Sequence, residues 1–571
     1  MDTQKRYNLW QWRIIIVSMV CYAIFYFVRK NFSIAMPGLT AEYGISNTSF
    51  GIIIGLGSIV YGLARFINGF IVDKVSTKVF MAIGLFLCAL ANFCFGFGAD
   101  LSYLITGVHD GPQFVNMLIL VMGVTIVLNQ YFQGMGYPPC ARMLPTWIPP
   151  GQLATKMSIW NTSHSIGAIA ASVVCGLIMS NMGADMTGDS SIVHAITQNL
   201  AGSIKGWDNL PAAEQTSRIL SYAGHYGAWR WCFWIPALFA LVGAILILIG
   251  LKDKPQDVGL PEVEGTHTGK DDTTGQKGAH SAFLRHMVFK NRWVWTLSIA
   301  NIFVYVLRVG VLDWGPKFLT EHRGMDIKSA AWSVAFFELL AIFGTIFAGW
   351  ATDHLFKGKA HRMCVVSMIG AVIFFGLFAL LPNIPTALSI FILALGGFCI
   401  YGPQALIGIG AANQATKEAS ATANGLTGIL GYVGSALAAI AIGLIADHFG
   451  WNAVFLTFIF VGIIGVLIFL SMWRPHATAT PAPRNSPPPS STRPRILSPV
   501  RRISRRRSPR KRKKKKRSAR RRIKPLAPDP VESRRGLAAG PAGSLQDAAV
   551  STRYGGIGFL GKDHRRPVRD Q

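Results

Sequence analysis

The sequence predicts an all-α membrane protein that crosses the bilayer twelve times. Hydrophobic residues make up 51% of the 571 residues, and the mean hydropathy is +0.37. Apolar runs of about 20 residues recur along the chain, which is enough to cross ~30 Å of hydrocarbon as helices. Together these observations exclude an ordinary soluble protein.

The twelve spans can be placed in order along the chain. The first has no small-residue cleavage site after a short apolar core, so we expect a retained helix rather than a signal peptide. The predicted spans are 11–36, 50–72, 78–98, 115–137, 158–182, 229–251, 292–318, 330–351, 362–382, 386–411, 421–446 and 450–473.

Changes in composition divide the chain into four parts. Residues 252–290 are polar and rich in Gly, Thr and Asp, which predicts a cytoplasmic linker between an N-terminal six-helix half (1–251) and a C-terminal six-helix half (291–473). Residues 474–571 carry 28 Lys and Arg against five Asp and Glu, a net charge of +23, whereas residues 1–473 carry only +6. This Pro/Ser-rich, polybasic tail has no apolar periodicity and is predicted to be disordered.

Charge in the short loops predicts the orientation of the spans, because Lys and Arg concentrate on the cytoplasmic side. The third loop has Asp100 and Asp110 but no Lys or Arg, and the loop over 183–228 is long and only lightly charged. Both termini are therefore expected in the cytoplasm. The basic positions are Lys5, Arg6, Lys74, Lys78, Arg142, Lys156, Lys357, Lys359 and Arg362.

The two halves share an internal repeat. GFIVDKVSTK and GWATDHLFKGK each follow the second span of their half, and both place cations after Gly-x-x-x-Asp, at Asp73 and Asp353. Arg29 precedes Asp73 by 44 residues, and Arg308 precedes Asp353 by 45. An arginine thus recurs late in the first span of each half, which indicates the parallel repeat of a major facilitator fold.

Ionisable residues inside the spans are candidate functional residues, because inserting each costs ~2.5–3.5 kcal/mol. As repeat-related positions, Arg29 and Arg308 are expected to face one site between the halves. Two guanidinium forks suit a tetrahedral oxyanion, so a phosphate-bearing substrate is favoured over a dicarboxylate. The other candidates are Lys30 and Arg65, which either bind substrate or snorkel; Asp313 and Glu338, which either neutralise cations or serve the site; and His164.

His164 lies in SIWNTSHSIGAIAAS, a stretch of small residues in the fifth span. A lone histidine on a helix is often only a satisfied polar side chain. Asn161, however, lies three residues earlier and shares a helix face with it. Because histidine titrates near neutrality, a partly protonated imidazole would tune anion affinity.

Six stretches together resemble the organophosphate:phosphate antiporter family, which includes glycerol-3-phosphate and hexose-phosphate transporters, over roughly residues 8–473. They are FYFVRKNFSIAMP, YFQGMGYPPCARML, SIWNTSHSIGA, IFVYVLRVGVLDWGPKFL, FCIYGPQALIGI and ANGLTGILGYVGSALA. The resemblance implies that Arg29 and Arg308 grip phosphate, with His164 and Lys30 at the site. It also implies pore-lining roles for Tyr22, Tyr26, Tyr401, Tyr432 and Gln133.

Two departures from the family pattern bear on these roles. Leu153 and Ala154 stand where the family has Arg-Gly, and Ser165 stands where it has Asn after the histidine. The resemblance implies exchange of inorganic phosphate for an organic phosphate ester by alternating access, in a bacterial inner membrane and by a monomer. Glycerol-3-phosphate is favoured over hexose phosphate, and the choice is expected to rest on hydroxyl partners such as Asn161, Glu338 and Gln404.

Other functions are weighed by their own sequence features. A transporter-like sensor that signals to a kinase would keep the same ligands and stays open as the alternative. An ATP-driven pump is rejected, because GIGFLGKD has Asp563 where a P-loop needs Ser or Thr. RRRSPRKRKKKKR favours contact with lipid head groups over specific nucleic-acid binding.

The cysteines predict neither metal nor disulfide chemistry. None has C-x-x-C spacing, and all fall in or beside apolar spans, so neither a zinc site nor a disulfide framework is indicated. No cofactor and no enzymatic activity are expected. The eight positions are Cys21, Cys88, Cys94, Cys140, Cys175, Cys232, Cys364 and Cys399.

Overall fold

Twelve long apolar helices form the core of the computed structural model, which describes residues 3–262, 283, 285–381, 384–415 and 419–473. Each is long and apolar enough to cross a membrane, so the predicted all-α fold with twelve spans is confirmed. The prediction of a disordered basic tail over 474–571 lies outside the described residues, as does most of the predicted linker.

The spans follow one another as expected from hydropathy. The first six are α1 (Thr3–Tyr43), α2 (Asn47–Val72), α3 (Thr77–Gly96), the pair α5 (Gly111–Gln133) and α6 (Tyr137–Trp147), the pair α7 (Pro150–Asn161) and α8 (Ser163–Asn181), and α11 (Ala228–Gly250). The last six are α13 (Arg292–Glu321), α14 (Ile327–His354), α15 (Ala360–Leu380), α16 (Thr386–Ala415), α17 (Ser420–Phe449) and α18 (Trp451–Ser471).

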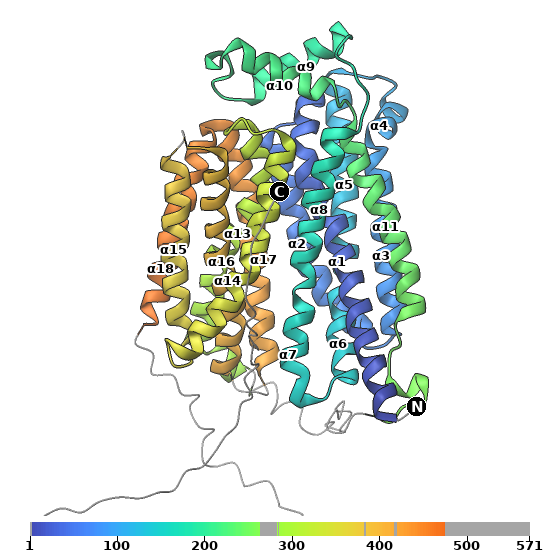
Figure 1. Cartoon of the computed structure of the whole chain (residues 1–571), viewed down its shortest axis with the longest axis vertical. Helices are drawn as coiled ribbons and strands as arrows, with labels where there is room; N and C mark the ends of the chain where they lie inside the picture. The colour runs from blue at the N-terminus through green and yellow to red at the C-terminus, as the bar shows by residue number, and fades with distance from the viewer. Residues whose placement is uncertain (1–2, 263–282, 284, 382–383, 416–418, 474–571) are drawn as a thin grey trace, which may run out of the picture. The chain divides into compact units, whose positions relative to one another are not determined.

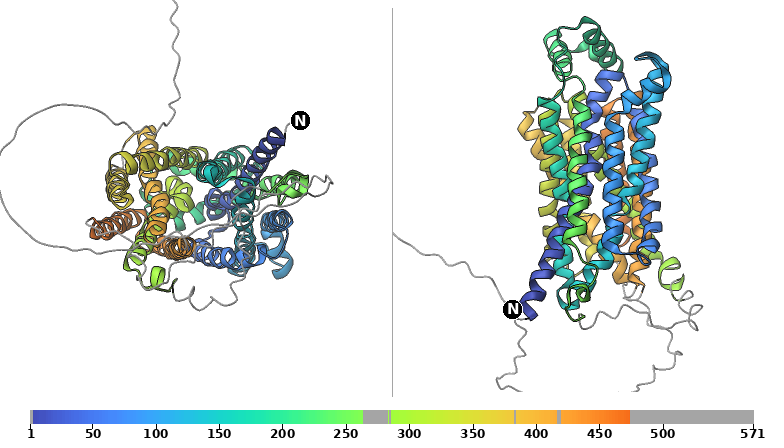
Figure 2. Two further views of the ribbon diagram at one scale, coloured as in Figure 1. Left: turned by 90° about the horizontal axis from the view of Figure 1, so that it is seen from below. Right: turned by 90° about the vertical axis from the view of Figure 1, so that its right-hand side faces the viewer.

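Within the compact unit Met1–Pro487, the helices gather in two groups. Figure 1 shows α1 to α11 in blue and green beside α13 to α18 in yellow and orange, and Figure 2 shows the same grouping along the helix axes. Between the groups, α2 packs on α17 and α8 packs on α14. A β-carbon at Gly51 of α2 would lie 2.6 Å from the Ala439 carbonyl oxygen, so glycine is what lets these two helices touch.

The first helix is longer than its apolar run predicts. α1 extends to Thr3 and Tyr43, whereas the predicted span was 11–36. Hydropathy detects only the part that faces hydrocarbon, and the polar start of α1 is held by other contacts. The Tyr7 hydroxyl and the Gln11 side-chain amide both donate to the Trp147 carbonyl at 2.8 Å.

The segment predicted as a long loop over 183–228 contains regular structure, and we call residues 183–227 the cap. It holds α9 (Ser190–Ser203), the 3₁₀ turn η1 (Trp207–Asn209) and α10 (Ala212–Ala223). Asp189 starts α9 by accepting from the Ser191 and Ile192 amides at 2.9 and 3.3 Å, a typical N-cap. Figure 2 shows the cap at the end of the helices opposite the N-terminus.

At the N-terminal end, the start of the linker packs on the first group of helices. The Asp253 carboxylate accepts from the Ser76 hydroxyl at 2.6 Å and from the Lys78 amide at 2.9 Å, and also from the Thr77 hydroxyl. Burial acts to raise the pKa of Asp253, but these hydrogen bonds outweigh it and lower the pKa. The carboxylate therefore fixes the first turn of α3.

One buried contact recurs in both groups of helices. Glu42 at the end of α1 accepts from the Trp229 indole N–H at 2.9 Å. Glu321 at the end of α13 accepts from the Trp451 indole N–H at 2.9 Å. Glu42 and Glu321 are 279 residues apart, as are Arg29 and Arg308. This recurrence supports two copies of one unit, while the boundaries 1–251, 252–290 and 291–473 stay a prediction.

Candidate functional site

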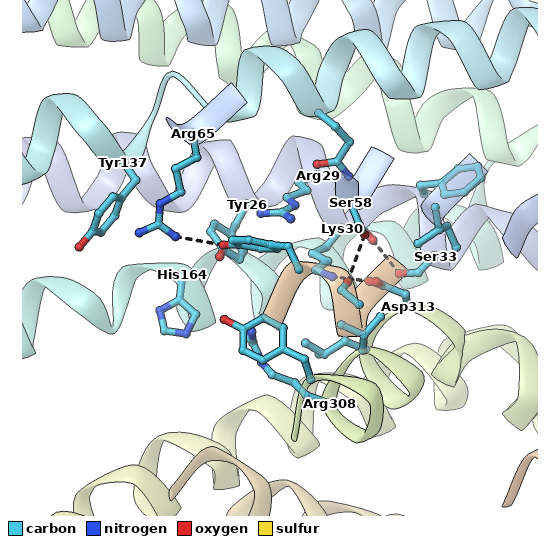
Figure 3. A pocket seen from close by; sticks show the side chains of 18 of the residues that line it. Tyr26, Arg29, Lys30, Ser33, Ser58, Arg65, Tyr137, His164, Arg308 and Asp313 are labelled. Atoms are coloured by element: carbon cyan, nitrogen blue, oxygen red, sulfur yellow. Dashed lines mark hydrogen bonds and ion pairs between the residues drawn. The ribbon is translucent and has the colours of Figure 1, made fainter. Parts of the chain in front are cut away.

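A cavity of about 200 Å³ lies between the two groups of helices. Its polar lining comes from α1, α2, α5, α6, α7, α8, α13, α16 and α17, so both groups contribute to it. Figure 3 shows the side chains that converge there. The predicted site residues among the lining are Tyr22, Tyr26, Arg29, Lys30, Arg65, Asn161, His164, Arg308, Asp313, Gln404 and Tyr432.

The two repeat-related arginines reach the same cavity from opposite groups. The Arg29 guanidinium carbon lies 3.8 Å from the centroid of the Tyr61 ring. That of Arg308 lies 4.7 Å from the Tyr401 ring, and this side chain is only 8% exposed. Ring faces attract a guanidinium without using its N–H groups. Arg308 also makes a side-chain hydrogen bond with Tyr401, but its buried Nε–H has no hydrogen-bond partner within the described residues. This N–H therefore remains available for an anion.

A third arginine lines the cavity. Arg65 of α2 lies with its guanidinium carbon 3.9 Å from the Tyr137 ring and donates to the Tyr432 hydroxyl at 3.0 Å. Tyr432 belongs to α17, so this hydrogen bond joins the two groups of helices. The sequence left open whether Arg65 binds substrate or snorkels toward the membrane surface. In the structure its side chain lines the cavity.

Lys30 and Asp313 form an ion pair across the cavity, and their side chains are 13% and 15% exposed. Asp313 therefore neutralises a cation, which is one of the two roles that the sequence left open for it. Lys30 already has a partner in this carboxylate. Three arginines are left against no further carboxylate among the described lining residues. The cavity consequently has an excess of positive charge.

His164 is positioned by its own helix. Its Nδ1 donates to the Asn161 carbonyl, and its ring lies 5.6 Å from that of Tyr26. The Nε2 atom is buried and has no hydrogen-bond partner within the described residues. A nitrogen in this state is available to a molecule entering the cavity.

Several predicted residues lie outside this lining. Gln133 donates from its amide to the Phe25 carbonyl at 2.8 Å, and Gln130, one turn earlier, lines the cavity instead. Tyr401 lies behind Arg308 and donates to the fully buried Glu338. The roles of Gln133, Tyr401 and Glu338 at the site stay predictions. Each would act by holding a residue near the cavity rather than by lining the cavity itself.

Asp73 and Asp353 lie at the far ends of α2 and α14 from the cap. Asp73 is 3.7 Å from Arg142, and its side chain is 70% exposed. Asp353 is exposed in the last turn of α14. Their repeated position near the cations of both halves predicts that these two carboxylates pair charges or gate transport, and such a role would act at the helix ends and away from the cavity.

The structure adds lining residues that the sequence analysis did not select: Tyr61 as a ring behind Arg29, and Ser33, Ser58, Gln130, Tyr137, Tyr305 and Ser435 as cavity lining. Tyr305 had a usable signal, because it precedes Arg308 by three residues as Tyr26 precedes Arg29. Ser58 and Ser435 lie 3.1 Å apart across the two groups. Their meeting depends on how α2 packs on α17, which no local pattern reveals.

A twelve-helix membrane fold around a cationic cavity defines the class of protein as a membrane transport protein of the major facilitator type. The Major Facilitator Superfamily model matches residues 18–439 and 406–523. Two solved structures share the fold. A bacterial homolog to the human lysosomal transporter Spinster has a TM-score of 0.59 at 14% identity, covering 81% of this chain and 96% of that one. A D-xylose-proton symporter has a TM-score of 0.59 at 12% identity, covering 81% and 97%.

Relatives of known name narrow the class. The glycerol-3-phosphate transporter of Bacillus subtilis (strain 168) is 32% identical over 471 residues, 81% of this chain and 92% of that protein. The probable hexose phosphate transport protein of Chlamydia trachomatis is 30% identical over 484 residues, 82% and 92%. The membrane sensor protein UhpC of Escherichia coli is 29% identical over 473 residues, 82% and 93%.

The chain belongs to the major facilitator superfamily and, within it, to the organophosphate:phosphate antiporter family. It is an integral membrane protein and not an enzyme.

Proposed function

We propose that this protein exchanges an organic phosphate ester for inorganic phosphate by alternating access, in a bacterial plasma membrane with both termini in the cytoplasm. The carrying observation is that Arg29 and Arg308 reach one cavity from opposite groups of helices. Their N–H edges form charge-assisted, bidentate hydrogen bonds with phosphoryl oxygens. The names of the relatives support a phosphate ester as substrate.

Exchange follows from the charge of the cavity. With the site empty, Arg29 and Arg308 repel each other and resist the approach of their helices. A bound phosphoryl group cancels this repulsion, so the loaded protein changes conformation more readily than the empty one. Phosphate carried one way must then be replaced by phosphate or ester carried back.

The test is phosphate exchange by the full chain in liposomes. We expect Arg29→Gln or Arg308→Gln to lower the exchange rate about 100-fold, since losing a buried charged hydrogen-bond donor costs ~3 kcal/mol. Lysine at either position keeps the charge but not the fork, so a smaller loss of about tenfold is expected. The control is Arg292→Gln, an exposed cation of the same helix as Arg308. Full exchange in either glutamine variant would refute the proposal.

The ester we favour is glycerol-3-phosphate. The contacts that distinguish esters would come from polar cavity residues away from the arginines, such as Asn161 and Gln404. Competition of glycerol-3-phosphate and hexose phosphates against labelled phosphate uptake tests this choice. Stronger competition by a hexose phosphate would overturn it.

A sensor is the second candidate, because the similarity to UhpC is nearly as extensive as that to the transporters. A sensor would bind the ester with the same arginines but would not release phosphate. Vesicles loaded with labelled phosphate separate the two functions. Release on adding external ester supports exchange, and binding without release supports the sensor.

A further inference from the structure

The cap is anchored firmly in the first group of helices. Its apolar residues pack as a small cluster on Ala41 of α1, and they are Ile196, Leu200, Ile204, Trp207 and Ala223. The Asn199 amide donates to the Ala41 carbonyl at 3.0 Å. At the exit of the cap, the Gly227 amide donates to the Glu42 carboxylate at 2.7 Å. The cap therefore moves as part of the first group.

The same cap reaches the second group through polar side chains, one of which is Tyr222 of α10 in a side-chain hydrogen bond with Thr320 of α13. Lys205, between α9 and η1, donates to the His448 carbonyl near the end of α17. Arg218 of α10 donates to the Glu321 carbonyl at the end of α13 at 3.4 Å, and Glu214 orients its guanidinium at 2.6 Å. Both acceptors are main-chain carbonyls at helix ends, where carbonyl groups lack partners within their helix.

Two of the helix ends that the cap contacts, those of α1 and α13, belong to helices that carry site arginines. Glu42 follows Arg29 by 13 residues in α1, and Glu321 follows Arg308 by 13 residues in α13. At 1.5 Å per residue, each glutamate lies about 20 Å along its helix from the arginine. A tilt of either helix that accompanies binding at the cavity must therefore move the ends held by the cap.

The cap is not alone in closing this end. Asp447 of α17 accepts from the Asn47 and Thr48 amides of α2 at 3.1 and 2.6 Å, and Lys317 of α13 donates to the Thr40 hydroxyl of α1. The two groups are thus joined at the cap end in this conformation.

We propose that the cap is an extracellular latch, which holds the ends of α1 and α13 together and sets how often the cavity opens to the outside. This inference rests on the proposed function for its orientation. Its hold on the second group consists of polar contacts made by Lys205, Arg218 and Tyr222, whereas its hold on the first includes an apolar cluster. When the groups separate at this end, the Lys205 and Arg218 contacts break while the anchor stays intact.

The experiment removes the two cationic contacts, those of Lys205 and Arg218, and measures access from outside. A reporter cysteine is placed by Met179→Cys, because Met179 is only 5% exposed and lines the cavity of about 120 Å³ beneath the cap. Right-side-out vesicles are treated with a membrane-impermeant maleimide. We expect the variant K205Q/R218Q to raise the labelling rate at this cysteine about tenfold. Without the reporter, the same double variant should half-saturate at a lower external phosphate concentration, because the outward-open fraction is larger.

The matched control is His194→Gln on α9, whose side chain contacts Gln198 of its own helix and should change neither measurement. The chain with native Met179 gives the background from the native cysteines, six of which are buried. An unchanged labelling rate and unchanged half-saturation in K205Q/R218Q, at an unchanged melting temperature, would overturn the latch. Faster labelling with unchanged half-saturation would also overturn it, since the cap would then only cover the entrance.

The labelling does not depend on transport, so the two proposals can fail separately. Loss of exchange in the unmodified chain would refute the proposed function and leave the labelling comparison valid. Normal exchange with no effect of K205Q/R218Q on either measurement would refute the latch alone.

Discussion

Lys30 and Asp313 depend on each other for charge neutralisation, because they form an ion pair across the cavity. Removing the carboxylate by Asp313→Asn leaves Lys30 as a buried, unpaired cation. Breaking a buried ion pair in this way costs ~3–5 kcal/mol, whereas replacing both members is far less costly. We therefore expect Asp313→Asn to lower the melting temperature in detergent more than the double variant K30M/D313N does.

The comparison needs a variant that alters the same helix without unpairing a charge. Arg292→Gln on α13 serves this purpose, since its exposed side chain is outside the cavity. If K30M/D313N melted at or below the temperature of Asp313→Asn, the ion pair would not be what couples these two residues.

Single residues show clearly what the sequence could predict. Arg29 and Arg308 could be predicted, because a charge inside an apolar span at a repeated spacing is rarely accidental. Gln133 was selected for the pore although Gln130 lines the cavity. Gln130 and Gln133 are three residues apart and so lie on the same side of α5. The Phe25 carbonyl of α1 takes up the Gln133 amide, and the sequence does not show which of the two glutamines meets α1 and which meets the cavity.

Among the elements, the contact between α2 and α17 is the most sensitive to side-chain size. We expect Gly51→Ala to push these helices apart, because its β-carbon would lie 2.6 Å from the Ala439 carbonyl oxygen. Backbone cannot yield as a flexible side chain can, so both the melting temperature and phosphate exchange should fall.

Gly376→Ala on α15 is the control for that substitution, as its nearest neighbour would be Ile459 at 3.9 Å. Replacing glycine inside a helix by alanine favours the helix by up to ~1 kcal/mol, so this variant should be neutral or slightly stabilised. Equal behaviour of the two alanine variants would show that α2 and α17 are not closely packed in the membrane.

Elements in the bilayer were easier to predict than those outside it. The twelve spans follow from apolar runs, since hydrocarbon thickness fixes their length. The cap was predicted as a loop because its helices are short and mixed in polarity. Asp189 before Ser190 and Ser191 was a usable N-cap signal, but the partner surface on Ala41 could be known only from the fold.

At the scale of the whole molecule, we expect residues 1–473 to carry out transport without help from the basic tail. Among the residues that the structure describes, those lining the cavity lie between Tyr22 and Ser435. Deleting residues 475–571 should therefore leave phosphate exchange within about twofold of the full chain. Liposomes with and without anionic lipid measure whether the tail, at a net charge of +23, adds only electrostatic attraction to the membrane. A truncated protein that inserts normally but has lost exchange would contradict this view.

The tyrosine rings behind the arginines affect which anions compete for the empty cavity at physiological salt concentrations. Chloride is abundant, and a cavity lined by cations attracts it as a counter-ion. Because Arg29 and Arg308 rest on ring faces, their charge is partly balanced while N–H groups stay free, among them the buried Nε–H of Arg308. Such N–H groups fit several oxygen atoms held in a tetrahedron better than one spherical ion, so we expect the geometry of the cavity to favour phosphate over chloride.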